Sequence, residues 1–396
     1  MELRYTIIMK IVHITNVFGE FGRGGAENLV ARVAAAQAGQ GHEVHVFTTV
    51  PWNARGVEVL ANGIIVHKLF HWCLFLNGQG KSELERTINT VWTFFNVPLA
   101  IEVWLQLNKI RPNIIHTHNL AGTSFLIPRL AQNISKHIHT VHDIQLIIPS
   151  GRMQAGEEFA PHNHSRAVRM YQRMTRMWFG NPAVVTAASN WLLQYYKSQK
   201  YFSRSHMELV RQFFVAAQPP GSIRRARFTI LFAGELSESK GVKMLVDWFV
   251  KFAHGLYLPL DLFIFGAGPL QEYILAAAAH TPEIHFEGSV APDVLAEYMR
   301  SSHVVVVPSL IYENSPNVVI EALACHTPVS VSDIGGAAEL IAANPQNGWV
   351  VEPTTDAWEA HLTWLVQNQQ AVLEKDPVLL SSADAATHFL NLYEQT

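Results

Sequence analysis

Two carboxylates, Glu313 and Glu321, stand with seven residues between them in the stretch VVVVPSLIYENSPNVVIE, which covers residues 304–321. The apolar run that opens this stretch predicts a strand buried on both faces, and the following VVIEALAC has the apolar spacing of a helix packed on the sheet. Pro316 suits the first turn of that helix, because its missing N–H would otherwise be an unpaired donor. The loop between them should lie at the carboxyl end of a strand, where open α/β sheets bind ligands.

This arrangement suggests a specific chemistry. The free N–H groups at the start of the helix could bind an anion, with the carboxylate of Glu321 directed at hydroxyl groups. A solvated loop before an ordinary helix that carries a surface glutamate is the simpler interpretation of the spacing taken alone.

The segment ENSPNVVIEALAC, with the TPV and DIGGAAELI that follow it, resembles the signature of retaining glycosyltransferases of family 4. The two glutamates of that family's pattern are also separated by seven residues. The resemblance implies an α/β chain of GT-B architecture. In that architecture two Rossmann-like domains have parallel sheets that face a central cleft, and a C-terminal helix crosses back to the first domain.

Length and composition set the expected domain bounds. The chain has 396 residues, enough for two domains of ordinary size, and AAQPPGSIRRAR has the Pro/Gly-rich composition of a linker. We expect an acceptor-side domain over 1–215, the linker over 216–227, a nucleotide-sugar-binding domain over 228–378 and the returning helix over 379–396.

The segment FTILFAGELSESKG matches the family's GRLxxxKG pattern with Lys240 in place, but Glu235 stands where arginine is usual. The resemblance implies that these two positions neutralise the donor diphosphate, for which lysine serves as a point charge. A glutamate would repel phosphate. Either a nearby arginine substitutes, or activity is weak, or the donor is held differently.

The resemblance also assigns roles to other residues. Glu321 would hold the ribose hydroxyls and Glu313 the donor sugar, and the backbone of the loop that ends IHFEGSV, residues 288–290, would read the base. His142 occupies the position of a family histidine that contacts the donor sugar, and a neutral imidazole can donate to or accept from hydroxyls. The expected catalytic residues are Glu313, Lys240 and His142, and the expected donor-binding residues are Gly24, Gly25, Gly234, Gly266, Ser289, Val290, Asn314, Ser315, Pro316, Asn317 and Glu321.

The first glycine-rich loop, which feeds a helix expected over 26–38, resembles the family's GGAE segment facing the donor phosphates and the acceptor. Taken alone, these glycines are explained equally well by a flexible turn. Gly266-Ala267-Gly268 could open a nicotinamide-binding fingerprint, but no third glycine follows in register.

We expect no metal and no cofactor besides a UDP- or GDP-linked sugar as donor substrate. The sequence has no Asp-x-Asp motif, and cationic side chains with helix dipoles can neutralise a diphosphate. His116 and His118 alternate along a strand and could suggest a metal, but no cysteine or carboxylate shares their spacing. Polar residues at a strand end are the preferred interpretation.

Composition excludes several classes of protein. A net charge of −3 lacks the excess of positive charge expected of a nucleic-acid-binding protein. Two cysteines argue for a reducing compartment rather than a disulfide framework. No apolar run is long enough to span a bilayer, no signal-peptide pattern opens the chain, and residues 1–8 look like a leader. We expect a cytoplasmic protein, with a peripheral contact at the inner face of the membrane as an option.

That option rests on SRAVRMYQRMTRMWF. Its four arginines recur at three- and four-residue steps and so share one helix face: Arg166, Arg169, Arg173 and Arg176. A neighbouring face carries Met170, Met174, Met177 and Trp178. Either this is a solvated face over a buried stripe, or it contacts an anionic lipid surface or a lipid-phosphate acceptor.

The expected function is transfer of a sugar, with retention of configuration, from a nucleotide diphosphate-sugar to a glycan or lipid-linked acceptor in envelope or exopolysaccharide biosynthesis. The alternative is a catalytically weak or idle GT-B protein that binds a sugar nucleotide or acts as a scaffold. Glu235 motivates that alternative, as does His326, which replaces the glycine of the family's CGTP turn and should strain it.

Overall fold

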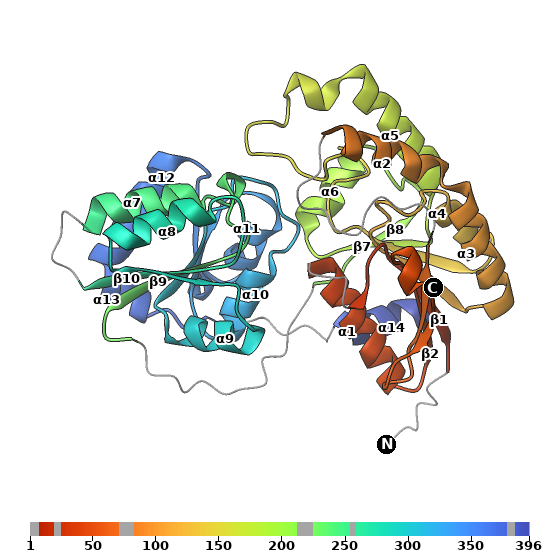
Figure 1. Ribbon diagram of the computed structural model, residues 1–396, viewed down its shortest axis with the longest axis horizontal. Coiled ribbons are helices and arrows are strands. Elements are labelled where there is room, and N and C mark those ends of the chain that lie inside the picture. Colours follow the sequence, from red (N-terminus) through yellow and green to blue (C-terminus); the bar gives the residue numbers. More distant parts are fainter. Residues whose placement is uncertain are drawn as a thin grey trace. The chain divides into compact units, whose positions relative to one another are not determined.

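The computed structural model describes residues 8–19, 25–70, 83–211, 225–253, 259–377 and 385–395. The expected leader apart from Ile8, the linker apart from 225–227, and Gly24 lie outside the described residues. The chain divides into two compact units (Figure 1). Unit 1 comprises 1–151, 161–211 and 383–396, and unit 2 comprises 152–160 and 212–382.

Unit 1 is built on an eight-stranded sheet in the order β3-β4-β2-β1-β5-β6-β7-β8. Every neighbouring pair is parallel except the antiparallel edge pair β3–β4. The strands are β1 (Lys10–Ile14), β2 (Glu43–Thr49), β3 (Gly56–Val59), β4 (Ile65–Leu69), β5 (Ile114–Thr117), β6 (Lys136–Thr140), β7 (Val184–Ala187) and β8 (His206–Leu209). Strand β1 lies between β2 and β5, and four of its five residues are buried.

Helices cover this sheet, and two of them begin at serines whose hydroxyls accept from backbone N–H groups, as N-cap residues do. Ser165 caps α5 through Val168, and Ser189 caps α6 through Leu192, each at 3.2 Å. The α-helices are α1 (Gly25–Gly39), α2 (Glu83–Phe95), α3 (Val97–Ile110), α4 (Ile127–Ala131), α5 (Arg166–Phe179), α6 (Asn190–Ser198) and α14 (Ala385–Gln395). Short 3₁₀ turns are η2 (Trp52–Ala54) and η3 (Pro161–His164).

The C-terminal helix α14 belongs to unit 1. Phe389 and Tyr393 share a hydrophobic cluster with Ile11 of β1 and Val33 of α1. The expected return of the last helix to the first part of the chain is therefore confirmed.

Unit 2 contains a six-stranded sheet in the order β11-β10-β9-β12-β13-β14, parallel throughout. Its strands are β9 (Phe228–Ala233), β10 (Leu260–Phe265), β11 (Ile284–Gly288), β12 (Val304–Val307), β13 (Val329–Ser332) and β14 (Gly348–Val351). All four valines of β12 are buried, so the strand predicted from the apolar run is confirmed.

Helices lie against both faces of this sheet, because successive strand residues point to opposite sides. Val304 and Val306 join one core cluster, with Phe249 and Trp358, while Val305 joins the other. The helices are α7 (Val242–Ala253), α8 (Gln271–His280), α9 (Pro292–Ser301), α10 (Asn317–Ala324), α11 (Gly335–Ala342), α12 (Thr355–Gln367) and α13 (Gln369–Leu373), with 3₁₀ turns η4 (Glu238–Lys240) and η5 (Pro345–Asn347). Both units thus have the α/β architecture that was expected.

The strand order of unit 2 reverses beside β9. From β9 the chain proceeds outward through β10 to β11, then returns to pair β12 against the other side of β9. A crevice at the carboxyl ends of two strands that diverge in this way is the usual ligand site of an open α/β sheet. The loops after β9 and β12 lie at this point of the sheet.

Residues 152–160 belong to unit 2 although the chain before and after them belongs to unit 1. We call this segment the strap. Its backbone forms an antiparallel bridge between Gln154 and Ile311, and Ala155 N donates to Leu310 O at 2.8 Å. Tyr312 N donates to Met153 O at 3.0 Å, and the Tyr312 hydroxyl bonds to Glu158. The strap is thus fixed to the loop after β12.

No helix in the described parts of the chain combines the length and apolar character needed to cross a membrane.

Candidate active site

Lys240 and Glu313 meet at the point where the strand order of unit 2 reverses. Lys240 ends the turn after β9, Glu313 lies in the loop after β12, and Lys240 Nζ is 2.7 Å from Glu313 Oε1. Ser309 Oγ donates to the same carboxylate oxygen at 2.7 Å. Both charged side chains are about one-fifth exposed, so they can meet a ligand while remaining held in place.

The two loops are also joined through their backbones. Leu310 N donates to Ser239 O at 2.8 Å, which fixes the residue before Lys240 against the loop that carries Glu313. The cation and the carboxylate are therefore positioned by main chain as well as by their own charges.

Glycine is required where the loop after β13 passes Glu313. Gly335 has a φ of 62°, and a Cβ at this position would lie 2.4 Å from Glu313 O. The next residue, Gly336, donates its N–H to that carbonyl at 2.8 Å. The GG pair in DIGGAAELI thus lets α11 begin directly against the Glu313 backbone.

A second cation comes from the strap. Arg152 Nη1 lies 3.6 Å from Glu235 Oε2, in the same loop as Lys240. The sequence left open whether a nearby arginine could offset the glutamate, and the structure brings Arg152 to it. The pairing could not be expected from the sequence, because it depends on the strap, whose attachment is made by backbone hydrogen bonds.

The other residues expected near the donor follow β12 and begin α10. Pro316 has a φ of −68° and is the N-cap residue of the helix, which starts at Asn317, so it immediately precedes the first turn. The N-cap residue Pro316 makes no side-chain hydrogen bond to this N-terminus. Asn314 and Ser315 are half-buried in the loop, and Glu321 is half-buried in the second turn of α10.

The glycines after β9 and β10 face each other. Gly266 has a φ of 128°, and a Cβ there would lie 1.9 Å from Gly234 O, so these two loops touch through their backbones. Ser289 and Val290 follow β11 at the edge of the sheet, where Ser289 is exposed and Val290 packs partly against the core. The structure places Lys240, Glu313 and Gly234 in neighbouring loops and Ser289 two strands away.

The turn Cys325-His326-Thr327-Pro328 stands where the family has CGTP, and its backbone at His326 has the strained conformation that was expected. His326 has a φ of 55°, in the left-handed region that glycine occupies without strain. The preceding Cys325 is a buried free thiol, and burial raises its pKa.

His142 belongs to unit 1, in the loop after β6. Its Nε2 lies 3.3 Å from His118 Nδ1, and burial lowers its pKa to about 4, so the ring is neutral at pH 7. It lines a cavity of about 20 Å³ with His118, Thr140 and Asp143, enough space for one water molecule. Of the other residues expected in this half, Gly25 is the first residue of α1.

A hydrogen-bonded series of side chains leads to His142. Gln37 Nε2 donates to the Tyr393 hydroxyl at 3.4 Å, so its Oε1 is the acceptor for His13 Nε2 at 2.7 Å. His13 Nδ1 then accepts from His118 Nε2 at 3.1 Å, and His118 Nδ1 accepts from His142 Nε2. With the Gln37 amide in this orientation, Nδ1 of His142 is left unprotonated, as a hydrogen-bond acceptor.

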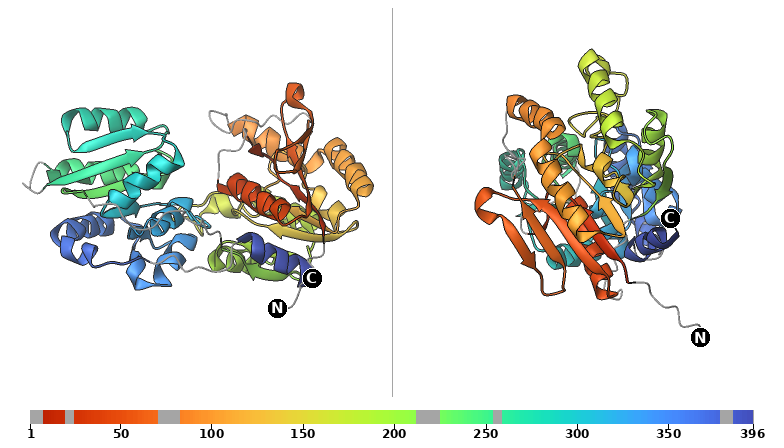
Figure 2. Two further views of the ribbon diagram at one scale, coloured as in Figure 1. Left: turned by 90° about the horizontal axis from the view of Figure 1, so that it is seen from below. Right: turned by 90° about the vertical axis from the view of Figure 1, so that its right-hand side faces the viewer.

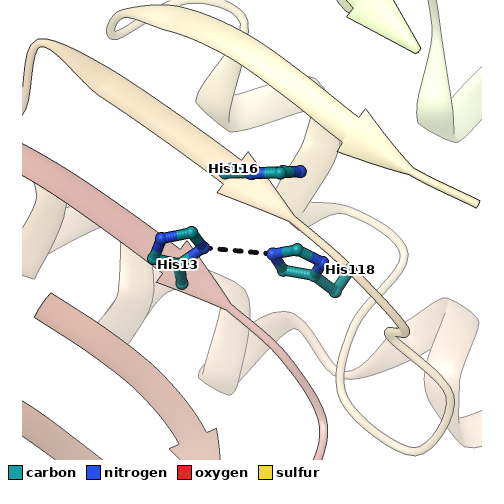
Figure 3. A group of neighbouring side chains, drawn as sticks. All are labelled: His13, His116 and His118. Carbon is teal, nitrogen blue, oxygen red and sulfur yellow. Dashed lines mark hydrogen bonds between the residues drawn. The ribbon is translucent and has the colours of Figure 1, made fainter. Parts of the chain in front are cut away.

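Three of these histidines are close enough to consider a metal site. Potential ligand atoms of His13, His116 and His118 all lie within 4.8 Å of one another (Figure 3). Zinc would require each nitrogen to lie about 2.1 Å from one point. His116 instead bonds to the Tyr393 hydroxyl at 2.6 Å and Thr140 Oγ1 at 2.7 Å. Since each ring nitrogen of the three histidines has a protein partner, hydrogen bonding explains the cluster without a metal.

The arginine face of α5 is only partly free. Arg166, Arg169 and Arg173 are exposed, but Arg176 donates to Gln199 O at 3.0 Å and lies over the Tyr201 ring. The buried stripe consists of Tyr171, Thr175 and Phe179 rather than the methionines, because Met170 and Met177 are exposed.

Comparison with known proteins bears on both halves of the chain. Residues 227–368 match the family model of glycosyl transferases group 1, and residues 23–212 match the model of glycosyltransferase family 4. An uncharacterised 42.6 kDa protein from the cps region of Klebsiella pneumoniae is 24% identical, over 84% of this chain and 87% of that protein. An uncharacterised glycosyltransferase of Methanocaldococcus jannaschii is 34% identical over 134 residues, which are 33% of this chain and only 34% of that relative.

Solved structures show the same fold. A sucrose-phosphate synthase from Thermosynechococcus elongatus has a TM-score of 0.69 at 18% identity, with 98% of each chain covered. Anabaena HepE, solved in complex with UDP, has a TM-score of 0.60 at 16% identity, over 98% of this chain and 95% of that one. The two family models and the GT-B fold agree with the resemblance carried by the Glu313–Glu321 segment. The chain therefore belongs to the group 1 glycosyltransferases of family 4.

Proposed function

We propose that this glycosyltransferase takes its sugar from a UDP- or GDP-linked donor and transfers it, with retention of configuration and without a metal ion, to a glycan or lipid-linked acceptor. The observation that carries the proposal is the Lys240–Glu313 pair at the strand reversal of unit 2. It combines a cation for a diphosphate with a carboxylate for sugar hydroxyls, in the crevice where such folds bind ligands.

The chemistry requires little more than charge stabilisation. The bond between the anomeric carbon and the diphosphate oxygen breaks, a bond to the acceptor oxygen forms, and the acceptor hydroxyl loses its proton. Negative charge develops on the departing diphosphate, so a positioned cation lowers the barrier. Lys240 supplies that charge, with the backbone N–H groups that open α10.

Arg152 resolves the difficulty posed by Glu235 in this proposal. The Arg152 guanidinium offsets the charge of Glu235, as Lys240 offsets that of Glu313, so Glu235 does not face the phosphates unopposed. A guanidinium can also bind two phosphate oxygens at once. The same pairing counts against the idle-scaffold alternative, which the unopposed charge of Glu235 had motivated.

The remaining roles follow the family pattern. Glu321 holds the ribose hydroxyls, Asn314 and Ser315 with the start of α10 contact the donor, and Ser289 and Val290 read the base through their backbone. Gly24, Gly25, Gly234 and Gly266 allow close backbone approach. His142 accepts from a sugar hydroxyl at Nδ1, which the series from Gln37 keeps unprotonated.

The proposed setting is envelope or exopolysaccharide biosynthesis in the cytoplasm, at the inner face of the membrane where a lipid-linked acceptor would be met. The relative encoded in the cps region supports this setting, and the three exposed arginines of α5 are suited to phosphate headgroups.

Thermal unfolding with UDP-, GDP- and ADP-sugars tests the donor, because a ligand that binds only the folded state raises its stability. We expect one nucleotide series to raise the melting temperature of the wild-type chain and to raise that of Lys240→Ala less. Release of the nucleoside diphosphate, measured with and without glycan acceptors, then tests transfer. Stabilisation without turnover on any acceptor would favour the scaffold alternative, and no stabilisation by any nucleotide would refute the donor assignment.

A further inference from the structure

The hydrogen-bonded series that ends at His142 begins at the C-terminal helix α14. The side chain of Tyr393 is 3% exposed and shares a hydrophobic cluster with Val33 of α1. In the left-hand view of Figure 2 the dark-blue α14, beside the C label, lies next to the red α1. The Tyr393 hydroxyl lies 2.6 Å from Nδ1 of His116 and 3.4 Å from Nε2 of Gln37. One phenol group thus joins two branches of buried polar side chains.

The branch through His116 shows that the Tyr393 hydroxyl is a donor there. Burial lowers the pKa of His116 well below its ordinary value, so the ring is neutral, and one nitrogen donates while the other accepts. Its second partner is the hydroxyl of Thr140, 2.7 Å from Nε2. A phenol is more acidic than an aliphatic hydroxyl and is the stronger donor. Tyr393 therefore donates to Nδ1, and Thr140 accepts from Nε2. The Thr140 hydroxyl can in turn donate to Thr186 Oγ1 at 2.7 Å.

The branch through Gln37 follows from that choice. Because the phenol proton is directed at His116, the Tyr393 oxygen can only accept from Gln37. The amide nitrogen of Gln37 therefore faces Tyr393, and the amide oxygen faces Nε2 of His13 at 2.7 Å. A carbonyl oxygen only accepts, so the proton of the neutral His13 ring is on Nε2. Gln37 is 0% exposed, so solvent does not compete for either end of the amide.

Each later ring of the series repeats the direction set at His13. Burial lowers the pKa of His13 and of His142 to about 4 and that of His118 well below its ordinary value, so each ring is neutral at pH 7 and has one N–H. His13 Nδ1 accepts from His118 Nε2 at 3.1 Å (Figure 3), and His118 Nδ1 accepts from His142 Nε2 at 3.3 Å. Reversing one of these bonds would reverse all of them. The orientation of one amide, that of Gln37, therefore decides which nitrogen of His142 is protonated.

We infer that Tyr393 is a positioning residue for His142: its hydroxyl orients the Gln37 amide, and through the series it keeps Nδ1 of His142 unprotonated. A sugar hydroxyl that meets this nitrogen then donates its proton, whereas in the reversed series it would have to accept one. The consequence for the donor rests on the proposed contact of His142 with the sugar. The inference adds that the last helix of the chain decides the polarity of that contact.

NMR of the ¹⁵N-labelled protein tests the inference without a ligand, because long-range proton–nitrogen spectra distinguish a protonated ring nitrogen from an unprotonated one. The His142 signal is identified by its absence in His142→Gln. In the wild type we expect Nε2 of His142 to be protonated. Tyr393→Phe removes the acceptor of the Gln37 amide N–H. A buried carbonyl is left unpaired more readily than a buried N–H, so the amide should turn and donate to His13. We then expect His142 to be protonated at Nδ1.

The matched control is Tyr201→Phe. Tyr201 is 2% exposed and belongs to the same unit, but its hydroxyl bonds to Leu146 O at 2.6 Å and to Thr175 at 2.7 Å, outside the series. Each variant loses one buried hydroxyl and keeps the ring, so both should fold, which thermal unfolding verifies. The control should keep the wild-type tautomer of His142.

A His142 ring protonated at Nδ1 in the wild type would overturn the inference, and so would a tautomer that Tyr393→Phe leaves unchanged. Calorimetry with UDP and UDP-glucose, and with GDP and GDP-mannose, reports the proposed function separately. Tyr393→Phe should bind the free nucleoside diphosphate like the wild type and the nucleotide-sugar about tenfold more weakly, since the sugar hydroxyl loses its acceptor. If the tautomer changes and the nucleotide-sugar still binds as tightly, the sugar contact of His142 is refuted. If neither nucleotide binds the wild type, the donor assignment fails while the NMR result stands.

Discussion

Lys240 and Glu313 form a 2.7 Å ion pair between the two loops that diverge at the centre of the unit 2 sheet. The carboxylate also accepts from Ser309, so Lys240 is held by an acid that is itself fixed. A donor diphosphate would share the lysine with this carboxylate, and a donor sugar would find the carboxylate beside it.

Replacing Lys240 by alanine should lower turnover by about two orders of magnitude, the scale of one electrostatic group acting on developing charge. The melting temperature should change little, because a partly exposed ion pair contributes little to stability. Lys243→Ala is the matched control, since Lys243 also forms an ion pair, at 2.8 Å to Asp247, on the following helix. Near-normal turnover of Lys240→Ala would remove the lysine from the site.

Glu321→Gln should weaken binding of the free nucleoside diphosphate by about 1–3 kcal/mol, because the neutral amide has one acceptor oxygen where the carboxylate offers two charged ones to the ribose hydroxyls. Isothermal calorimetry measures this directly. Glu297→Gln, on the exposed side of α9, should bind like the wild type. An unchanged affinity for Glu321→Gln would refute the ribose assignment.

Arg152→Ala should weaken binding of the nucleoside diphosphate about tenfold, since Glu235 is then left facing phosphate without its partner. Adding Glu235→Arg to that variant should restore affinity, because the cation then comes from the loop itself. Lys251→Ala removes another exposed ion pair of unit 2, 3.4 Å from Glu359, and should have no effect. A double variant no better than Arg152→Ala would show that charge at this position is not what the donor recognises.

His326→Gly should stabilise the protein by about 1 kcal/mol, because glycine adopts the φ of 55° without the strain that histidine bears. Thermal unfolding should show a rise of a few degrees. His280→Gly, at the end of α8, should instead lower the melting temperature, since no positive φ is relieved there. A lower melting temperature for His326→Gly would mean that the imidazole makes a compensating contact.

Acid should destabilise unit 1. Burial lowers the pKa of His13 to about 4 and that of His137 to about 3, whereas an unfolded histidine titrates near 6.5. The unfolded chain therefore binds more protons between about pH 4 and 6.5, so the free energy of unfolding falls as the pH decreases through that window. Denaturant titrations at pH 5, 6, 7 and 8 measure the slope, and His13→Gln should reduce it by about one proton. A slope unchanged by that substitution would mean that His13 is not neutral when folded.

The sequence predicted the parts of the fold that repeat a local pattern. Val304 to Val307 form a buried strand and Asn317 begins a helix because apolar spacing is read directly from the chain. Lys240 and Glu313 were assigned by resemblance, and the structure brings them together. Their roles in the reaction stay predictions.

The features of the structure that the sequence did not predict depend on contacts that leave no recognisable pattern of residue types in the chain. The strap pairs with Ile311 through backbone groups, which every sequence possesses, so the approach of Arg152 to Glu235 could not be foreseen. Helix α3 has apolar residues on both sides, and only the fold shows that Leu107 is buried while Leu105 is exposed. On α5 the helical spacing grouped four arginines on one face. Arg176 nevertheless lies over the ring of Tyr201, and helical spacing cannot predict a contact with a residue outside the helix.

The strap has a consequence for engineering chimeric enzymes. Because the chain enters unit 2 at 152–160 and again at 212, no single cut separates the two units. A donor-specificity graft that exchanged only residues 212–382 with a relative would leave the strap of one parent against the β12 loop of the other. Arg152 would then face whichever residue the relative has at position 235. A graft should therefore carry residues 152–160 with it, as a short second insert.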